Sequence, residues 1–229
     1  MMPALPPAWV WVAGLALATL VFTLWPGLDL AVSARFYDGS GFPVATDPLI
    51  EGIRRFFYAA EDVLGVLAFL LALWTRRRGP LLGQGARIWL YQGLIFVLGP
   101  LLLVNGVLKP LWARPRPDHL IDFGGALPFQ PIWQIGGLCT RSCSFTSGEM
   151  AGAVALSLMG VMLVRANQGR MGPAARRLAL ALALLPVPFT AWQRIAAGRH
   201  FLSDVTFSAL LVGLIASLLA QAMLHPRRP

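Results

Sequence analysis

Three polar clusters in this sequence hold residue types that could bind and transfer an anionic group. They are KPLWARPRP at Lys109–Pro117, SFTSGE at Ser144–Glu149 and RIAAGRHFLSD at Arg194–Asp204. Lysine and arginine neutralise phosphate oxygens, a helix start exposes backbone N–H groups, and a histidine can act as base or nucleophile. Together the clusters suggest phosphoryl chemistry, although each has a simpler explanation when taken alone.

The third cluster contains a possible catalytic pair. His200 and Asp204 are four residues apart and share a helix face if this turn is helical. A carboxylate bonded to one imidazole nitrogen fixes the tautomer and leaves the other nitrogen free as a base or nucleophile. A lone histidine is more often structural than catalytic, but a His–Asp pair beside Arg194 and Arg199 favours catalysis.

The second cluster is expected to open a helix. Ser147 and Gly148 would leave backbone N–H groups free, and the helix dipole favours an anion at that end. Thr146 or Ser147 could equally be a plain N-cap. Glu149 would lie in the first turn of a membrane helix, where an ionisable residue is a functional candidate.

The first cluster, alone, is best explained as a lipid-headgroup anchor. Its three cations and three prolines would end a helix and hold a positive loop near the membrane surface. Its importance depends on whether the other two clusters lie on the same face.

The composition requires membrane helices to position these clusters. Of the 229 residues, 57% are hydrophobic and 13% are charged, about half the charged share of about 25% in soluble domains. This excludes an ordinary soluble domain and a disordered chain. Because a spanning helix needs about 20 apolar residues, we expect an all-α polytopic membrane protein, a single domain over 1–229, with six helices near 8–27, 56–75, 86–108, 147–165, 177–195 and 203–224.

The loop charges predict the orientation. With a cytoplasmic N-terminus, ten of the 19 Lys and Arg residues lie in the cytoplasmic loops 75–87 and 165–177 and the tail 225–229, and the other nine lie at or near the opposite face. All ten acidic residues fall on that opposite side or in helices near it. The orientation rule counts basic residues near span ends, so the acids only support the placement of both termini in the cytoplasm and the three clusters on the outward face. The outward loop 28–55 could form short interfacial helices or stay a solvated loop.

The motif spacing resembles the type 2 phosphatidic acid phosphatase superfamily of membrane phosphatases. That family is marked by K-x6-R-P, P-S-G-H and S-R-x5-H-x3-D. Two of these spacings are intact here, as Lys109 with Arg116-Pro117 and as Arg194 with His200 and Asp204. The resemblance implies metal-independent chemistry without a cofactor, and the chain has no His, Cys and carboxylate cluster with metal-ligand spacing.

The resemblance also implies roles for individual residues. His200 would be the nucleophile that forms a phosphohistidine, and Asp204 would orient it. The phosphate oxygens would be bound by three cations and by backbone N–H groups, at Lys109, Arg116, Arg194, Ser147 and Gly148.

Two positions depart from the family pattern. Gln193 stands where the third motif usually has serine, and Glu149 stands where the second motif has histidine. In the family that histidine protonates the leaving-group oxygen. Glu149 could do the same if burial keeps it protonated, although nearby cations act in the opposite direction. His119, next to Asp118, is a second candidate acid.

The glutamate variant looks like the bacterial lipid A 4′-phosphatase branch, together with Phe123-Gly124-Gly125 and the segment from Cys139 to Cys143. This resemblance implies an inner-membrane enzyme that acts on lipid A at the periplasmic face, with a membrane lipid as its partner and no nucleic acid or obligatory protein partner. In the periplasm the two cysteines would form a disulfide, although two free thiols also suit their spacing.

Other functions remain open at this point. Undecaprenyl diphosphate and phosphatidylglycerophosphate are alternative substrates, and an anion transporter or channel is an alternative of a different class. A transporter would explain the intramembrane charges but not the His–Asp spacing. Glu61 and Asp62 could pair with site arginines, bind a substrate amine or sugar hydroxyl, or simply face water as interfacial acids.

Overall fold

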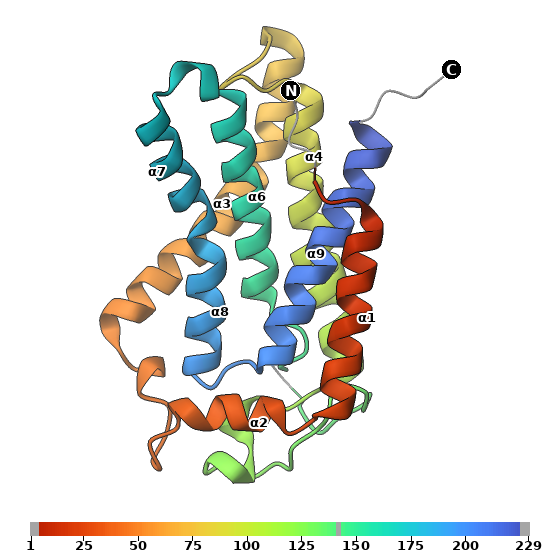
Figure 1. The fold of residues 1–229 in the computed structure, drawn as a ribbon, viewed down its shortest axis with the longest axis vertical. Coiled ribbons are helices and arrows are strands. Elements are labelled where there is room, and N and C mark those ends of the chain that lie inside the picture. Colours follow the sequence, from red (N-terminus) through yellow and green to blue (C-terminus); the bar gives the residue numbers. More distant parts are fainter. Residues whose placement is uncertain (1–4, 141–142, 225–229) are drawn as a thin grey trace.

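The computed structural model describes residues 5–140 and 143–224, and the regular structure within these ranges is helical. The long helices lie side by side in a bundle (Figure 1), so the predicted all-α class is confirmed. The helices are α1 (Ala8–Leu24), α2 (Leu28–Ser33), α3 (Pro48–Arg78), α4 (Ala86–Phe96), α5 (Lys109–Trp112), α6 (Gly148–Ala166), α7 (Pro173–Leu184), α8 (Pro186–Ala196) and α9 (Leu202–Met223).

The predicted membrane spans correspond to these helices. Five segments are long and apolar enough to cross a membrane, and the pair formed by α1 and Leu28–Phe36, bent by 88°, makes a sixth. The second span begins at Pro48 rather than at residue 56. The Asp47 carboxylate accepts hydrogen bonds from the backbone of Leu49 and Ile50, each 2.9 Å long. This N-cap starts the helix before residue 56, in a polar segment that hydropathy alone assigns to a loop.

Prolines shape two of the spans. α7 and α8 form the fifth span and meet at Leu185, because Pro186 and Pro188 cannot donate the backbone hydrogen bonds that a straight helix needs. The α-helix is therefore interrupted at Leu185 within this span. In the third span, α4 continues as a π-helical segment, Val97–Leu108, which contains Pro100. The Asn105 side-chain amide donates to the Pro100 carbonyl at 2.9 Å.

α1 packs against α9 through small residues. A Cβ atom on Gly213 would lie 2.4 Å from the Trp11 ring, so only glycine allows this close approach. Trp11 also donates its indole N–H to the Ser217 hydroxyl at 2.7 Å. Small residues one helix turn apart are the common device for bringing two membrane helices together.

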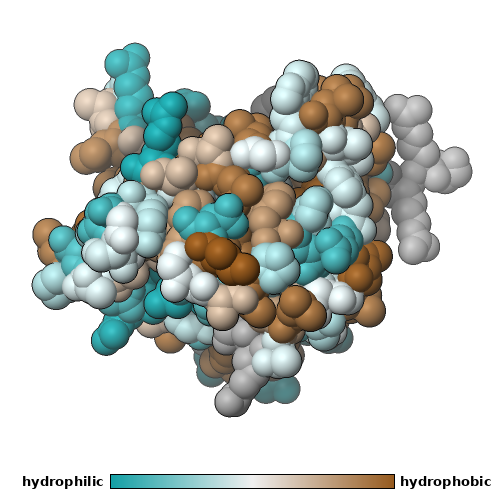
Figure 2. Space-filling view, turned by 90° about the horizontal axis from the view of Figure 1, so that it is seen from below, coloured by the Kyte–Doolittle hydropathy of each residue, from teal (hydrophilic) through white to brown (hydrophobic). Residues whose placement is uncertain are grey.

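One end of the bundle gathers the elements that carry the three polar clusters. α2 lies across this end, and α6 and α9 begin there while α8 ends there (Figure 1). α1 begins and α9 ends at the opposite end, as an even number of spans requires; the tail 225–229 lies outside the described residues. Seen from the site end (Figure 2), hydrophilic and hydrophobic side chains are mixed on the surface.

The loop 28–55 forms short helices at the site end of the bundle, as one of its two predicted alternatives has it. α2 is followed by single helical turns at Ala34–Phe36 and Pro43–Ala45, and the first turns of α3 complete the segment.

The loop between α5 and α6 exposes large apolar side chains, which suits contact with a lipid surface. These side chains are Ile121, Trp133, Ile135 and Leu138.

We predict that Gly213→Ala weakens the α1–α9 contact. The added methyl group would overlap the Trp11 ring, and overpacking of this kind costs about 1–3 kcal/mol. Gly52→Ala in α3 is the matched control, because nothing lies within 4 Å of its Cβ position. Thermal unfolding in detergent should show a lower Tm for Gly213→Ala alone. Equal Tm values for the two variants would contradict this packing.

Candidate active site

His200 and Asp204 come together where α8 turns into α9. The backbone N–H of His200 donates to the Arg194 carbonyl at 3.1 Å, and that of Phe201 donates to the Asp204 carboxylate at 2.8 Å. These two bonds place Nδ1 of His200 3.6 Å from Oδ2 of Asp204, just beyond hydrogen-bonding distance. Within the described ranges Nδ1 has no hydrogen-bond partner, so Asp204 is the group positioned to orient the ring.

The His200 side chain is only 2% exposed. Burial lowers the pKa of this imidazole to about 4, although the neighbouring Asp204 carboxylate acts in the opposite direction. The lowered pKa keeps the ring neutral at neutral pH, and a neutral imidazole has the free electron pair that a nucleophile or base needs.

Asp204 is held by Arg114, one of the cations that the sequence suggested as a surface anchor. Arg114 is completely buried and donates to Asp204 at 2.8 Å and to Asp29 of α2 at 2.9 Å. The hydroxyl of Ser144 donates to the second oxygen of Asp204. The anchor hypothesis is therefore wrong for Arg114, because its guanidinium is fully engaged inside the protein.

A second basic residue near the outward face, Arg199, also has an ion-pair partner. Arg199 pairs with Asp118 at 2.6 Å. His119, the second candidate acid, lies 3.7 Å from the same Asp118, and its side chain is 39% exposed. These residues form a half-exposed group at the rim of the site.

Lys109 and Arg116 remain available to an anion. Neither has an ion-pair partner in the part of the chain that the structure describes, and Nε of Arg116 is buried without a hydrogen bond. The Lys109 ammonium lies beside the first turn of α6, since a Cβ on Gly148 would be 3.3 Å from it. Ser147 caps that turn by accepting from Met150 at 3.3 Å.

Glu149 joins two arginines from different helices. Its carboxylate accepts from Arg194 at 2.7 Å and from Arg54 of α3 at 2.9 Å. Arg54 also pairs with Glu51 at 2.7 Å. Arg54 is not among the predicted site residues, because nothing in the sequence spacing connects α3 to the start of α6. The only local signal is the Glu51–Arg54 pair at helical spacing, which is common on solvent-facing helices.

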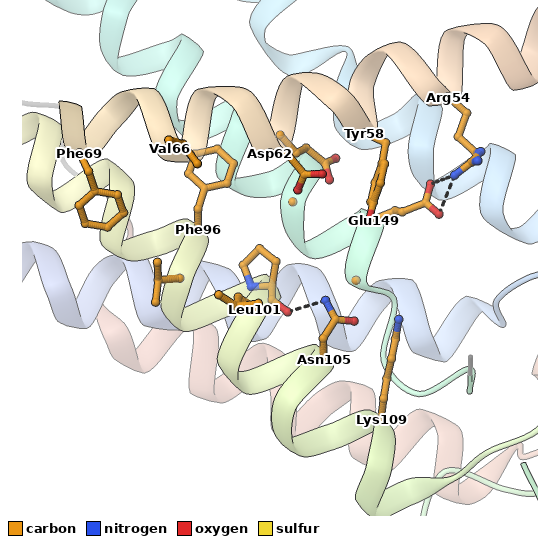
Figure 3. A pocket seen from close by; sticks show the side chains of 16 residues that line it. Arg54, Tyr58, Asp62, Val66, Phe69, Phe96, Leu101, Asn105, Lys109 and Glu149 are labelled. Carbon is orange, nitrogen blue, oxygen red and sulfur yellow. Dashed lines mark hydrogen bonds and ion pairs between the residues drawn. The ribbon is translucent and has the colours of Figure 1, made fainter. Parts of the chain in front are cut away.

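A cavity of about 740 Å³ opens beside this cluster, between α3, the third span and α6. Arg54, Glu149 and Lys109 line one end (Figure 3), and Val66, Phe69 and Phe96 line the other. A cavity that is polar at the bundle end and apolar deeper inside matches the polarity of a lipid with a charged headgroup.

The loop before α6 is closed by a disulfide between Cys139 and Cys143. Ser144, which donates to Asp204, follows directly in the chain. The backbone N–H of Ser144 also donates to the Arg114 carbonyl at 2.8 Å. The disulfide therefore lies next to the residues that hold Asp204 in place.

Comparison with known proteins identifies the family. Residues 88–228 match the PAP2 superfamily, a segment that contains all three clusters and more than half of the chain. The chain belongs to the PAP2 superfamily. It is thus a phosphomonoester hydrolase, embedded in the membrane and acting on a lipid, and the predicted family is confirmed.

Three relatives of this PAP2 phosphatase carry the name lipid A 4′-phosphatase. The protein from Rhizobium etli is 32% identical over 93% of this chain and 84% of its own length. That from Rhizobium leguminosarum is 31% identical over 94% and 92%, and that from Francisella tularensis subsp. novicida is 28% identical over 85% and 86%. No solved structure matches the chain.

The three motifs of this PAP2 phosphatase meet at one end of the bundle. The backbone N–H of Ser147 points to the Asp204 carbonyl at 3.5 Å, which joins the second motif to the third. Lys109 lies beside Gly148, which joins the first motif to the second. Among residues 5–140 and 143–224, no three His, Cys, Asp or Glu side chains are grouped to hold a metal ion.

We predict that Arg114→Met destabilises this phosphatase strongly. The substitution leaves the buried carboxylates of Asp29 and Asp204 without their cation, and removing one member of a buried ion pair costs about 3–5 kcal/mol. Arg199→Met is the matched control: its side chain is 38% exposed, and exposed pairs contribute about 1 kcal/mol or less. Thermal unfolding in detergent measures both, and similar losses would show that Arg114 does not hold the site together.

Proposed function

We propose that this phosphatase removes the 4′-phosphate of lipid A at the periplasmic face of the inner membrane. The observation that carries the proposal is the cavity, whose charged end is lined by Lys109, Gly148 and Glu149 of the first two motifs and whose apolar end extends along α3 and α4. The three relatives with that name match nearly the full chain and support the same substrate. Undecaprenyl diphosphate and phosphatidylglycerophosphate would use the same chemistry on a different lipid.

Binding begins at the cations. The substrate phosphate is bound by Lys109, Arg116 and Arg194, with the N–H of Gly148 at the start of α6 completing the shell. The N–H of Ser147, the other predicted donor, already points to the Asp204 carbonyl. Arg194 is paired with Glu149 in the structure. The phosphate therefore replaces the Glu149 carboxylate as the acceptor for this guanidinium, and Glu149 is released toward the leaving-group side.

The phosphoryl group then moves to His200. Because Nδ1 faces Asp204, Nε2 is the attacking atom: the N–P bond forms as the bond from phosphorus to the lipid oxygen breaks. The cations stabilise the charge on the transferring group throughout. A water molecule then attacks phosphorus, which releases inorganic phosphate and restores the imidazole.

The lipid oxygen needs a proton as it leaves. Glu149, once released from Arg194, would accept the proton of the substrate phosphate monoanion and pass it to the leaving oxygen, and it would take a proton from the attacking water in the second step. His119 is the alternative donor, although it lies at the half-exposed rim. An anion transporter would need the cations but neither the His–Asp pair nor a proton donor, so hydrolysis accounts for more of the site.

The charges on the loops support a periplasmic active site. Arginine-rich loops 75–87 and 165–177 connect the spans at the end opposite to the site. Arginine-rich loops are typical of the cytoplasmic side, which supports the proposal that His200 faces the periplasm. A disulfide between Cys139 and Cys143 would be stable there.

We predict that the pH dependence of kcat/KM reflects the buried His200. Its pKa is lowered to about 4, so the nucleophile stays neutral above that pH, and activity should fall only as the pH approaches it. Phosphate release by the purified protein is measured across this range and corrected for the second ionisation of the substrate phosphate near pH 6. An acid limb near the ordinary histidine value of about 6.5 would contradict a buried neutral nucleophile.

The substrate is tested in cells. Mass spectra of lipid A from cells with and without the protein should differ by the loss of one phosphate, and fragmentation should locate the loss at the 4′ position. Cells that express His200→Ala are the control and should keep the phosphate. Unchanged lipid A in cells that contain the wild-type protein would overturn the proposed substrate.

A further inference from the structure

Glu61 lies in the wall of the cavity and has no role in the mechanism above. It belongs to α3, seven residues after Arg54, which places it about 10 Å farther along the helix. Its side chain lines the cavity together with Asp62; Figure 3 labels Asp62 between the charged end, with Glu149, and the apolar end, with Phe69. Glu61 is therefore deeper in the protein than the residues that would bind phosphate.

The absence of a side chain at Gly152 leaves room for the Glu61 carboxyl group. A Cβ on Gly152 would lie 2.0 Å from Oε2 of Glu61, so the carboxyl group packs directly on the backbone of α6. Gly152 follows Glu149 by three residues and shares its helix face. The Glu61 carboxyl group thus lies about one helix turn below the Glu149 carboxylate, on the same side of the cavity.

This carboxyl group is buried without a protein partner. Glu61 is 6% exposed, and within the described ranges it makes no hydrogen bond or ion pair: Arg54 is taken by Glu51 and Glu149. A polar group that is shielded from bulk water and has no hydrogen bond destabilises the folded protein. An unpaired acid in the wall of an open cavity is suited to binding a ligand that enters the cavity.

The chemistry of that partner follows from the depth and from the acceptor oxygens. The Glu61 carboxyl group packs on Gly152, which is four residues and about 6 Å along α6 from Gly148, where the phosphate would bind. In a phosphorylated lipid, polar groups this close to the phosphate belong to the junction between headgroup and acyl chains. In a diacylglycerol phosphate that junction offers ester carbonyls, which only accept hydrogen bonds. In an acylated amino sugar it offers amide N–H and hydroxyl groups, which donate them.

We propose that Glu61 is a specificity-determining residue that accepts a hydrogen bond from an amide or hydroxyl group at the sugar–acyl junction of the substrate. Asp62 lines the same part of the cavity and adds acceptor oxygens. The inference deepens the proposed function and rests on it. Glu61 selects acylated sugar phosphates over phosphomonoesters that lack a donor below the phosphate, and it takes no part in the transfer of the phosphoryl group.

The test compares two substrates on the same preparation of full-length protein in detergent. One is a phosphorylated glucosamine with amide- and ester-linked hydroxyacyl chains, and the other is dodecyl phosphate, which has no donor below the phosphate. Glu61→Ala should lower kcat/KM for the sugar lipid about tenfold, mainly through KM, because the substrate loses its hydrogen-bond acceptor and keeps an unpaired polar group inside the cavity. Its kcat/KM for dodecyl phosphate should stay within about twofold. The ratio of the two rates is independent of the fraction of folded protein.

Two further variants sharpen the test. Gly152→Ala fills the space that the Glu61 carboxyl group occupies and should reproduce the same selective loss with Glu61 still present. Asp122→Ala removes an exposed carboxylate outside the cavity and should leave the substrate ratio unchanged.

The outcomes separate this inference from the proposed function. If the wild-type protein cleaves the sugar lipid and Glu61→Ala changes neither substrate, or both equally, the subsite is wrong while the proposed function stands. If the wild-type protein cleaves dodecyl phosphate but not the sugar lipid, the proposed substrate is wrong, and so is the proposed role of Glu61 in selecting it.

Discussion

The buried guanidinium of Arg114 connects the elements on which the site depends. It joins Asp29 of α2 to Asp204 of α9, and its charged carbon lies 4.2 Å from the centre of the Phe201 ring. A buried charge destabilises the fold by several kcal/mol unless its partners are well placed. A shift of α2 or α9 relative to the loop after α5 would break one of these ion pairs and leave the buried charge unpaired. His200 is four residues from Asp204, and its position follows from the same set of contacts.

The site also has to contain several positive charges before a substrate arrives. Lys109, Arg116 and Arg194 lie within electrostatic reach of one another, and like charges at this separation repel. Glu149 offsets part of that repulsion by pairing with Arg194 and Arg54. The glutamate that replaces the family histidine therefore has two uses in our account: it stabilises the empty site, and it acts as the proton donor when phosphate has displaced it.

Hydropathy and motif spacing predict the parts of this protein that depend on local sequence. The six spans follow from runs of apolar residues, and the Lys109, Arg194 and His200 motifs follow from short spacings that the PAP2 superfamily shares. The polar start of α3 was missed because its apolar run begins only later, and a single side-chain cap at Asp47 decides the boundary.

The tertiary partners could not be predicted in the same way. Asp29 and Arg114 are 85 residues apart, and Arg54 and Glu149 are 95 apart; only the packing of the bundle brings each pair together. Arg114 and Arg116 lie two residues apart in the same proline-rich segment, and each is followed by a proline. One is buried in two ion pairs and the other is available to an anion, a difference that arises from contacts with α2 and α9.

The central claim is that His200 carries the phosphoryl group, and trapping that intermediate tests it most directly. The wild-type protein is mixed with a ³²P-labelled lipid phosphomonoester, quenched within one turnover and digested for mass spectrometry. We expect a phosphate label that is stable to base and labile to acid, located on His200, and absent from His200→Ala. A label on another residue, or full hydrolysis by His200→Ala, would contradict the account.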